Sequence, residues 1–147
     1  MQKCYLALGC FWKPEENFKN KSGILDTEVG YAGGDKVGVT YEEVCRGDTG
    51  HAETVKILFD EKVISYEKIL NIFFEMHDPT TLNSQGPDFG TQYRSEIFYL
   101  NDTQKEQAEK VLREVNQKLS DKVVTKISLL KNYCPAEEYH QMYLRKR

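Results

Sequence analysis

The pattern of apolar residues along the chain restricts the fold more than any other feature. Residues 54–59 alternate partly at every second position, as a β-strand does. Five apolar residues further along repeat at the spacing of an amphipathic helix: Tyr66, Ile69, Leu70, Phe73 and Phe74. The same criteria predict strands at 4–8, 27–31, 97–100 and 123–129, and helices at 10–20 and after a cap at Asn101 or Asp102.

The order of these elements is strand, helix, strand, strand, helix, strand, helix, strand. Such an order is typical of an α+β fold, because each helix can return the chain across a sheet that its neighbouring strands build. We therefore expect a two-layer, ferredoxin-like sandwich with helices packed on a mixed β-sheet. The chain has 147 residues and no linker or low-complexity tract, so residues 1–147 are expected to form a single domain.

Charge and hydropathy argue against two classes of partner. A net charge of -3 and a pI near 5.7 give no reason to expect a nucleic acid. No apolar run approaches the roughly 18 residues that span a bilayer, and the N-terminal apolar stretch ends too early, at Gly9, for a signal peptide. We expect a cytoplasmic, monomeric protein that does not bind a membrane. The four cysteines form no Cys-x-x-Cys pair and the three histidines are scattered, so no metal is expected.

Cys10 is the best candidate for a reactive thiol. It lies where the first predicted strand meets a helix, so free backbone N–H groups and the positive helix end should stabilise its thiolate. Gly9 permits a sharp turn beside the sulfur, and Lys13 could lower the thiol pKa further. A small buried residue in a tight corner would have the same position, and position alone leaves the two interpretations open.

Other candidate groups are less specific. The aromatic pair Phe11 and Trp12 could enclose a small methyl group beside Cys10, although such residues are more often part of a core. Glu53 begins a predicted strand after a polar loop, and a carboxyl held in a dry pocket there could donate a proton near neutrality. A solvated glutamate is the commoner case. The glycine-containing loop at 85–95 is either functional or an exposed connection.

Five segments in order along the chain resemble the A-type peptide methionine sulfoxide reductases. Each is a weak signal alone, but together they cover nearly the whole chain. The matching residues are Gly9, Cys10, Phe11 and Trp12; Gly30, Tyr31, Ala32, Gly33 and Gly34; Tyr41, Glu43, Val44, Cys45 and the run from Gly47 to Glu53; His77, Asp78, Pro79 and Thr80 with Asp88, Gly90 and the run from Thr91 to Ser95; and Ala136, Glu137, Tyr139, His140, Gln141 and Tyr143.

The resemblance implies a role for each residue that matches the family pattern. Cys10 would be the nucleophile, Phe11 and Trp12 would enclose the S-methyl group of the substrate, and Glu53 would protonate the sulfoxide oxygen. A protonated donor suits this chemistry, because the oxygen leaves poorly until it gains a proton.

The remaining family positions would assist the acid and the substrate. Tyr41 and Tyr93 would donate hydrogen bonds to the sulfoxide oxygen, and Asp88 would support the site and contact the substrate. The substrate would be the S epimer of oxidised methionine, in peptides, proteins or the free amino acid. The resemblance implies no metal and no organic cofactor.

Recycling of the oxidised enzyme is where the sequence departs from the family. Many members carry resolving cysteines in a tail after the last motif, and we expect that tail to be absent here. Cys4 would lie about 20 Å from Cys10 along a strand, beyond disulfide reach, and Cys45 is interpreted as structural. Cys134 remains a possible resolving thiol. The preferred hypothesis is direct recycling by an outside reductant, glutathione with glutaredoxin, or thioredoxin.

An alternative function keeps the reactive thiol and drops the turnover. In a redox-sensing or peptide-binding module, Cys10 could be oxidised by peroxide without any need for Glu53 as an acid or for an aromatic enclosure. Replacing Glu53 with Gln would separate the two, because sensing would persist while sulfoxide reduction would fail.

Overall fold

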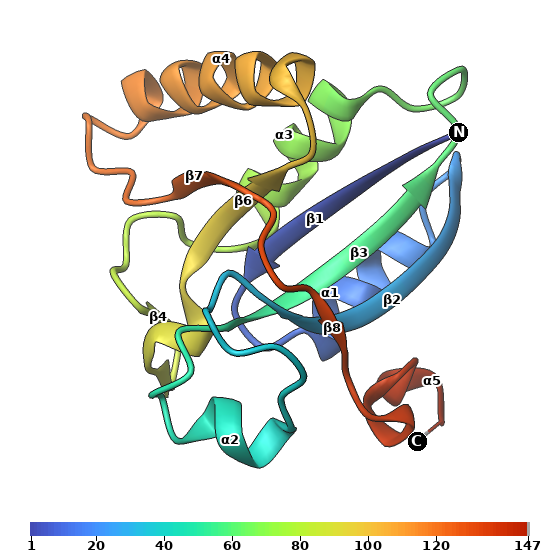
Figure 1. The fold of residues 1–147 in the computed structure, drawn as a ribbon. Helices are drawn as coiled ribbons and strands as arrows, with labels where there is room; N and C mark the ends of the chain where they lie inside the picture. The colour runs from blue at the N-terminus through green and yellow to red at the C-terminus, as the bar shows by residue number, and fades with distance from the viewer. Residues whose placement is uncertain (147) are drawn as a thin grey trace.

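The computed structural model describes residues 1–146 and is built around one six-stranded sheet (Figure 1). Adjacent strands are antiparallel except the edge pair β6 and β7, which is parallel. A separate two-stranded hairpin is formed by β4 (Ser84–Gln85) and β5 (Asp88–Phe89). In sheet order the six strands are β7 (Lys126–Leu129), β6 (Ser95–Tyr99), β1 (Gln2–Leu8), β3 (Ala52–Phe59), β2 (Ile24–Ala32) and β8 (Cys134–Pro135).

The centre of this sheet has the ferredoxin-like arrangement. The chain runs β1, α1 (Trp12–Lys19), β2, β3, α3 (Tyr66–Met76), β6, and the strands lie in the order β6-β1-β3-β2. The long helix α4 (Asp102–Lys118) then returns the chain to β7. The α+β prediction and its mixed sheet are therefore confirmed, with β7 and β8 as additions at the two edges.

The helices share a core with one face of the sheet. Alternate β1 residues Cys4 and Leu6 are fully buried there, in one cluster with Phe18 of α1 and Phe73 of α3. The residues between them face the other side, where residues 130–133 cross the sheet between β7 and β8 (Figure 1). Burying one large apolar side chain contributes about 1.5–3 kcal/mol, so this helical face holds the strand ends in place.

Several short elements differ from the sequence prediction. Helix α1 begins at Trp12, after Phe11 at the N-cap position, so Cys10 precedes the helix instead of opening it. The last predicted strand begins later, at Lys126. The remaining short elements were not predicted: the helices α2 (Tyr41–Cys45) and α5 (Tyr143–Lys146), the β4–β5 hairpin, β8, and the 3-10 turns at Thr91–Tyr93 and Glu138–His140. Each has at most five residues, too few to show a hydrophobic period.

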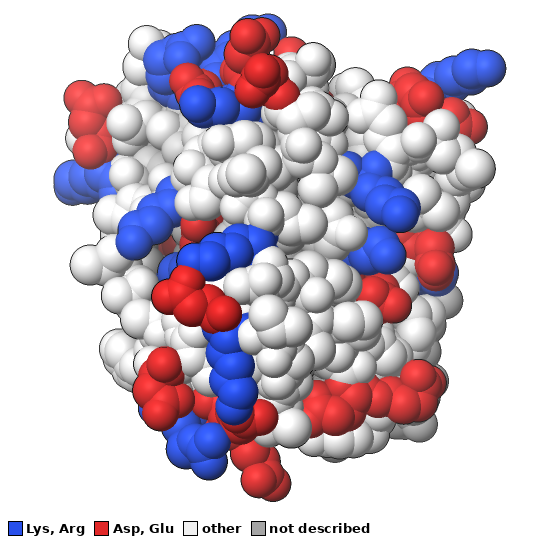
Figure 2. Space-filling model, viewed as in Figure 1, with Lys and Arg blue, Asp and Glu red and all other residues white. Residues whose placement is uncertain are grey.

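Charge and hydropathy give no sign of a nucleic-acid surface on the face in Figure 2 or of a membrane-spanning helix in the described residues. On the face in Figure 2, Lys and Arg side chains are interspersed with Asp and Glu, so this face has no continuous basic surface for a phosphate backbone. Within residues 1–146, no helix is both long and apolar enough to cross a membrane. The same described part of the chain contains no group of three or more acidic, cysteine or histidine side chains that could hold a metal ion.

Candidate active site

Cys10 lies in the turn that joins β1 to α1. Gly9 makes this turn with φ of +98°, which L side chains rarely adopt, and a Cβ there would come within 2.9 Å of the Gln85 side chain. The turn thereby brings the β4–β5 hairpin against the start of α1. The Cys10 side chain is partly exposed, so a substrate can reach its sulfur.

The Cys10 thiol is not activated in the way that the sequence predicted. Its pKa is raised to about 11, mainly by burial, and the lowering effect of the Trp12 backbone N–H is opposed by nearby Glu53, Asp88 and Cys45. The prediction of a lowered pKa is therefore wrong for the protein without substrate. The helix start does supply a donor, but the surrounding acidic groups and burial outweigh it.

Glu53 is an acid that contacts the start of α1. It is the second residue of β3, pairs with Tyr31 of β2, and is 1% exposed. One carboxyl oxygen accepts the Phe11 backbone N–H at 3.3 Å, and the other, Oε2, has no partner among the described residues. Burial raises the Glu53 pKa to about 8, with a further contribution from Asp88. The carboxyl is thus mostly protonated at neutral pH, with an oxygen left unpaired.

The two aromatic residues after Cys10 have different environments. Phe11 is completely buried and its ring lies 5.8 Å from that of Tyr31, so it belongs to the core as well as to the wall of the site. Trp12 is only partly buried. Its ring stacks on Tyr143 at 3.9 Å, and its indole N–H donates to His140 Nδ1 at 3.1 Å. Trp12 is therefore the member of the pair that solvent can reach.

Tyr41, Tyr93 and Asp88 come from three separate segments to the same place. Tyr41 opens α2, Tyr93 ends a 3-10 turn at Thr91–Tyr93, and Asp88 lies in the β4–β5 hairpin. Burial is the main cause that raises the pKa of both phenols, and Glu53 is among the nearby groups that raise it further. Both hydroxyls consequently keep their protons across the physiological range and can act as donors.

The segment of residues 134–143, here called the C-terminal strap, holds the site together. Glu137 accepts the Tyr31 hydroxyl at 2.9 Å and the Tyr41 backbone N–H at 3.0 Å. The Gln141 side chain bonds both backbone groups of Val29 at 2.9 Å. The sequence predicts no role for Glu137, His140 or Gln141, because these contacts are made with residues more than 90 positions away.

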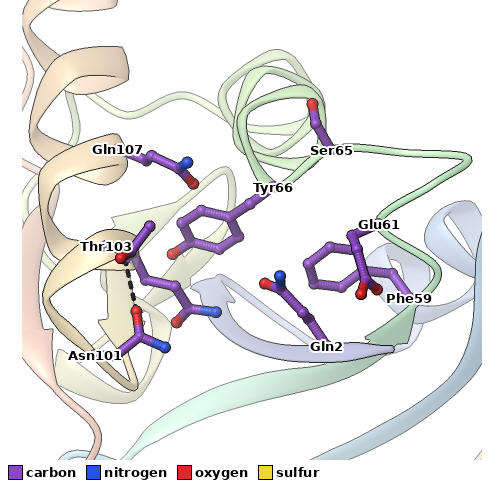
Figure 3. A pocket seen from close by; sticks show the side chains of 9 residues that line it. Gln2, Phe59, Glu61, Ser65, Tyr66, Asn101, Thr103 and Gln107 are labelled. Carbon is purple, nitrogen blue, oxygen red and sulfur yellow. Dashed lines mark hydrogen bonds between the residues drawn. The ribbon is translucent and has the colours of Figure 1, made fainter.

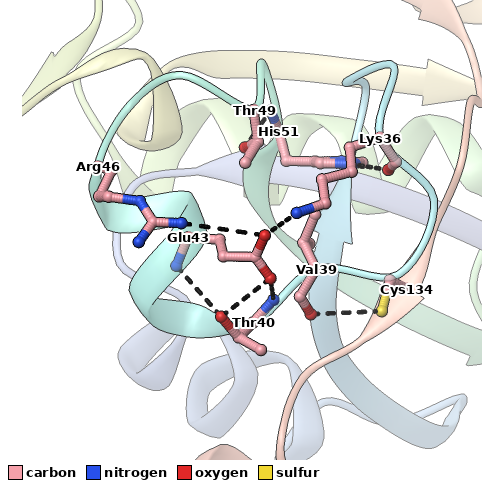
Figure 4. A network of polar contacts seen from close by, with 8 residues as sticks. All are labelled: Lys36, Val39, Thr40, Glu43, Arg46, Thr49, His51 and Cys134. Atoms are coloured by element: carbon pink, nitrogen blue, oxygen red, sulfur yellow. Dashed lines mark hydrogen bonds and ion pairs between the residues drawn. The ribbon is translucent and has the colours of Figure 1, made fainter.

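Two of the other thiols, Cys134 of β8 and Cys45 of α2, lie in elements near the site. Cys134 pairs with Tyr31 across β8 and β2, two strand spacings or about 10 Å from Glu53. Its sulfur points toward the Val39 carbonyl oxygen at 3.8 Å (Figure 4).

The sequence predicts a structural role for Cys45, and in the structure Cys45 is exposed at the end of α2. A capping box between Thr40 and Glu43 fixes that helix (Figure 4).

A polar cavity of about 320 Å³ lies elsewhere, where Gln2 of β1 and Tyr66 of α3 meet the start of α4 at Asn101 (Figure 3). Gln2 and Leu8 are the two ends of β1, about 20 Å apart. The cavity is therefore remote from Cys10, and its lining contains no thiol. The cluster around Cys10 and Glu53 is the candidate active site.

Comparison with known proteins gives matches over nearly the whole chain. The model of the family described as "Peptide methionine sulfoxide reductase" matches residues 2–147. The chain is 70% identical to the peptide methionine sulfoxide reductase MsrA of Pelagibacter ubique over 100% of both chains. Reduced Mxr1 of Saccharomyces cerevisiae has a TM-score of 0.95 at 42% identity, covering 99% of this chain and 85% of that one. Mxr1 in complex with Trx2 gives 0.69 at 28% identity, covering 97% and 84%.

Proposed function

The chain belongs to the peptide methionine sulfoxide reductase family, A type, and on that premise we propose how its residues carry out the reaction. The family makes it an oxidoreductase that reduces oxidised methionine. Cys10 is the nucleophile and Glu53 is the proton donor. Trp12, with Phe11 behind it, encloses the S-methyl group of the substrate, and Asp88 supports the site beside the substrate backbone.

The observation that carries this assignment is the unpaired oxygen of Glu53. A buried carboxyl with a pKa of about 8 keeps a proton at neutrality, and its Oε2 has no partner among the described residues. A sulfoxide oxygen placed there would receive that proton. Tyr41 and Tyr93, whose raised pKa values keep them protonated, donate to the same oxygen as negative charge develops on it.

The chemical step transfers one oxygen atom. Cys10 sulfur attacks the sulfoxide sulfur while Glu53 protonates the sulfoxide oxygen, and the proton that the thiol loses restores the proton on Glu53. The oxygen ends on Cys10 as a sulfenic acid, and methionine leaves as the thioether. The sulfoxide gains two electrons and the Cys10 sulfur loses two, so this step needs no further reductant. A site with chiral walls accepts one epimer, which we assign as S.

An outside thiol then reduces the sulfenic acid. Its sulfur attacks Cys10 sulfur and releases water, and a second thiol cleaves the mixed disulfide. The distance of Cys134 from Glu53, about 10 Å by strand spacing, supports an outside reductant over Cys134. The complex of Mxr1 with Trx2 supports a thioredoxin, and glutathione with glutaredoxin is the other candidate.

The free cysteines support a cytoplasmic location for the reaction. All four cysteines are free thiols, which fits the reducing conditions of the cytoplasm. We propose that the protein acts as a monomer on oxidised methionine, free or in peptides and proteins.

Two cysteine variants test the assignment in one assay with S-methionine sulfoxide and dithiothreitol. Cys10→Ser should lose all turnover, because a hydroxyl cannot take up the oxygen as a sulfenic acid. Cys134→Ser is the matched control and should keep more than about a tenth of the parent rate, a loss below roughly 1.4 kcal/mol. Substantial turnover by Cys10→Ser would overturn the nucleophile, and a regeneration block in Cys134→Ser would make Cys134 the resolving thiol.

A further inference from the structure

Two residues of the C-terminal strap contact the ring of Trp12. Tyr143 stacks on it at 3.9 Å with an interplanar angle of 20°, and His140 lies at 5.7 Å and 28°. The indole N–H donates to His140 Nδ1 at 3.1 Å. This hydrogen bond joins residues 128 positions apart, so it fixes the plane of the indole relative to the strap.

The direction of this bond determines the state of His140. An indole N–H can only donate, so His140 Nδ1 must carry its lone pair. The neutral imidazole then has its proton on Nε2, which is buried and has no partner among the described residues. The imidazolium would carry a proton on both nitrogens and could not accept from Trp12.

The surroundings of His140 are the walls of the candidate active site. The residue is 1% exposed, and its ring lies 5.4 Å from that of Phe11 and 4.4 Å from that of Tyr41. Of the aromatic and acidic residues proposed for the reaction, His140 thus contacts three: Phe11, Trp12 and Tyr41. It is therefore placed to orient these three side chains.

We propose that His140 is a positioning residue, which holds the Trp12 indole against the S-methyl group of the substrate while its imidazole is neutral and releases the indole when protonated. The inference rests on the proposed function, because Trp12 matters only if it encloses the substrate. It adds a pH-dependent control of substrate affinity that the chemistry at Cys10 and Glu53 does not require.

The groups that face His140 decide when it is protonated. Burial lowers its pKa below the ordinary value, and the carboxylate of Glu137 on the same strap opposes this effect. Tyr41 of α2 and Tyr139 contribute neutral rings, as do Phe11 and Trp12 before and in α1. Since the pKa is lowered, the neutral form dominates at physiological pH, and the indole is released only on acidification.

Two substitutions separate hydrogen bonding from packing. His140→Phe keeps an aromatic ring but removes the acceptor, whereas His140→Asn keeps an amide oxygen near the position of Nδ1 and does not titrate. Losing the acceptor should raise the KM for S-methionine sulfoxide about tenfold in His140→Phe, the scale of one hydrogen bond. The kcat should change less than the KM. His140→Asn should recover most of the affinity, and Tyr139→Phe, which alters an exposed neighbour, should match the parent.

Fluorescence gives a readout that is independent of turnover. Trp12 is the single tryptophan of the chain, so its emission reports this site alone. Emission of the parent should change on acidification, with a midpoint below pH 6.5, the ordinary histidine pKa, and the change should be absent in both His140 variants. Thermal unfolding of each variant checks that it is folded.

Three results of these experiments would contradict the proposal. An unchanged KM in His140→Phe, or an acid transition of Trp12 emission that survives in His140→Asn, would overturn the proposal. Equal KM losses in the Phe and Asn variants would also contradict it, since packing alone would then explain them. A parent that forms no methionine would instead remove the proposed function, while the fluorescence result would still decide whether His140 holds the indole.

Discussion

At the scale of single residues, the site keeps its two reacting groups uncharged. Burial is the main cause that raises the pKa of both the Cys10 thiol and the Glu53 carboxyl, and the nearby Asp88 raises the pKa of each as well. Sequence reasoning predicted the raised pKa of Glu53 but predicted the opposite shift for Cys10. The sequence shows the helix start and Lys13, but it does not show that folding buries the Cys10 thiol near Glu53 and Asp88.

The raised pKa of Glu53 makes a prediction about stability. The folded protein binds a proton there that the unfolded chain has released once the pH exceeds its ordinary pKa of 4.5. Between pH 4.5 and about 8 the folded state therefore holds more protons, and stability falls as pH rises. Glu53→Gln has no such titrating group. The free energy of unfolding of the variant minus that of the parent should therefore increase by on the order of 4 kcal/mol as pH rises across that window.

Urea unfolding of both proteins at pH 5 and pH 8 measures this difference. The same Glu53→Gln variant should have less than about a hundredth of the parent turnover, because an amide cannot protonate the oxygen. Glu42→Gln, which changes an exposed carboxyl on α2, is the matched control and should alter neither quantity. A parent and a Glu53→Gln variant with parallel pH profiles of stability would show that Glu53 is not buried in its neutral form.

At the scale of elements, His77 joins the end of α3 to β6. Its Nδ1–H donates to the Phe73 carbonyl at 2.6 Å, and its Nε2 accepts the Ser95 hydroxyl at 2.7 Å. Ser95 in turn contacts the Thr125 hydroxyl at 2.7 Å, close to the start of β7. The neutral imidazole satisfies both of its bonds, and burial lowers its pKa to about 4.

This junction should weaken in acid. Between the ordinary histidine pKa of 6.5 and about 4, the unfolded chain binds a proton that the folded His77 does not, so stability falls as pH falls. The contribution of His77 lost over that interval is on the order of 3 kcal/mol. His77→Asn should be less stable than the parent at pH 7 but should lose less on acidification. A constant difference between the two from pH 7 to pH 4 would refute this account.

The elements also show where sequence reasoning stops. The long periodic elements α3 and α4, together with β1, β3 and β6, could be predicted, because each presents an apolar face with a clear period. The short β8 and the β4–β5 hairpin could not, because two residues carry no period and only tertiary contacts define them. Helix α2 did carry a readable signal in Thr40 and Glu43, the two ends of a capping box.

At the scale of the whole molecule, the fold assembles the site at one end of the sheet. Cys10 follows β1, and Glu53 is the second residue of β3. Tyr41 and Tyr93 lie in short helical segments from two other parts of the chain. The order of motifs could suggest which residues act together. It could not show that the C-terminal strap, through Glu137 and His140, ties Tyr41 and Trp12 to the sheet, since that depends on contacts between distant segments.

The most direct test of the account is a single turnover of the reduced protein with S-methionine sulfoxide, in which methionine formed and thiols lost are counted per chain. The account predicts one methionine and one thiol lost, because Cys10 ends as a sulfenic acid that awaits an outside reductant. One methionine with two thiols lost would show an internal disulfide and would contradict the proposed recycling. No methionine at all would contradict the roles given to Cys10 and Glu53.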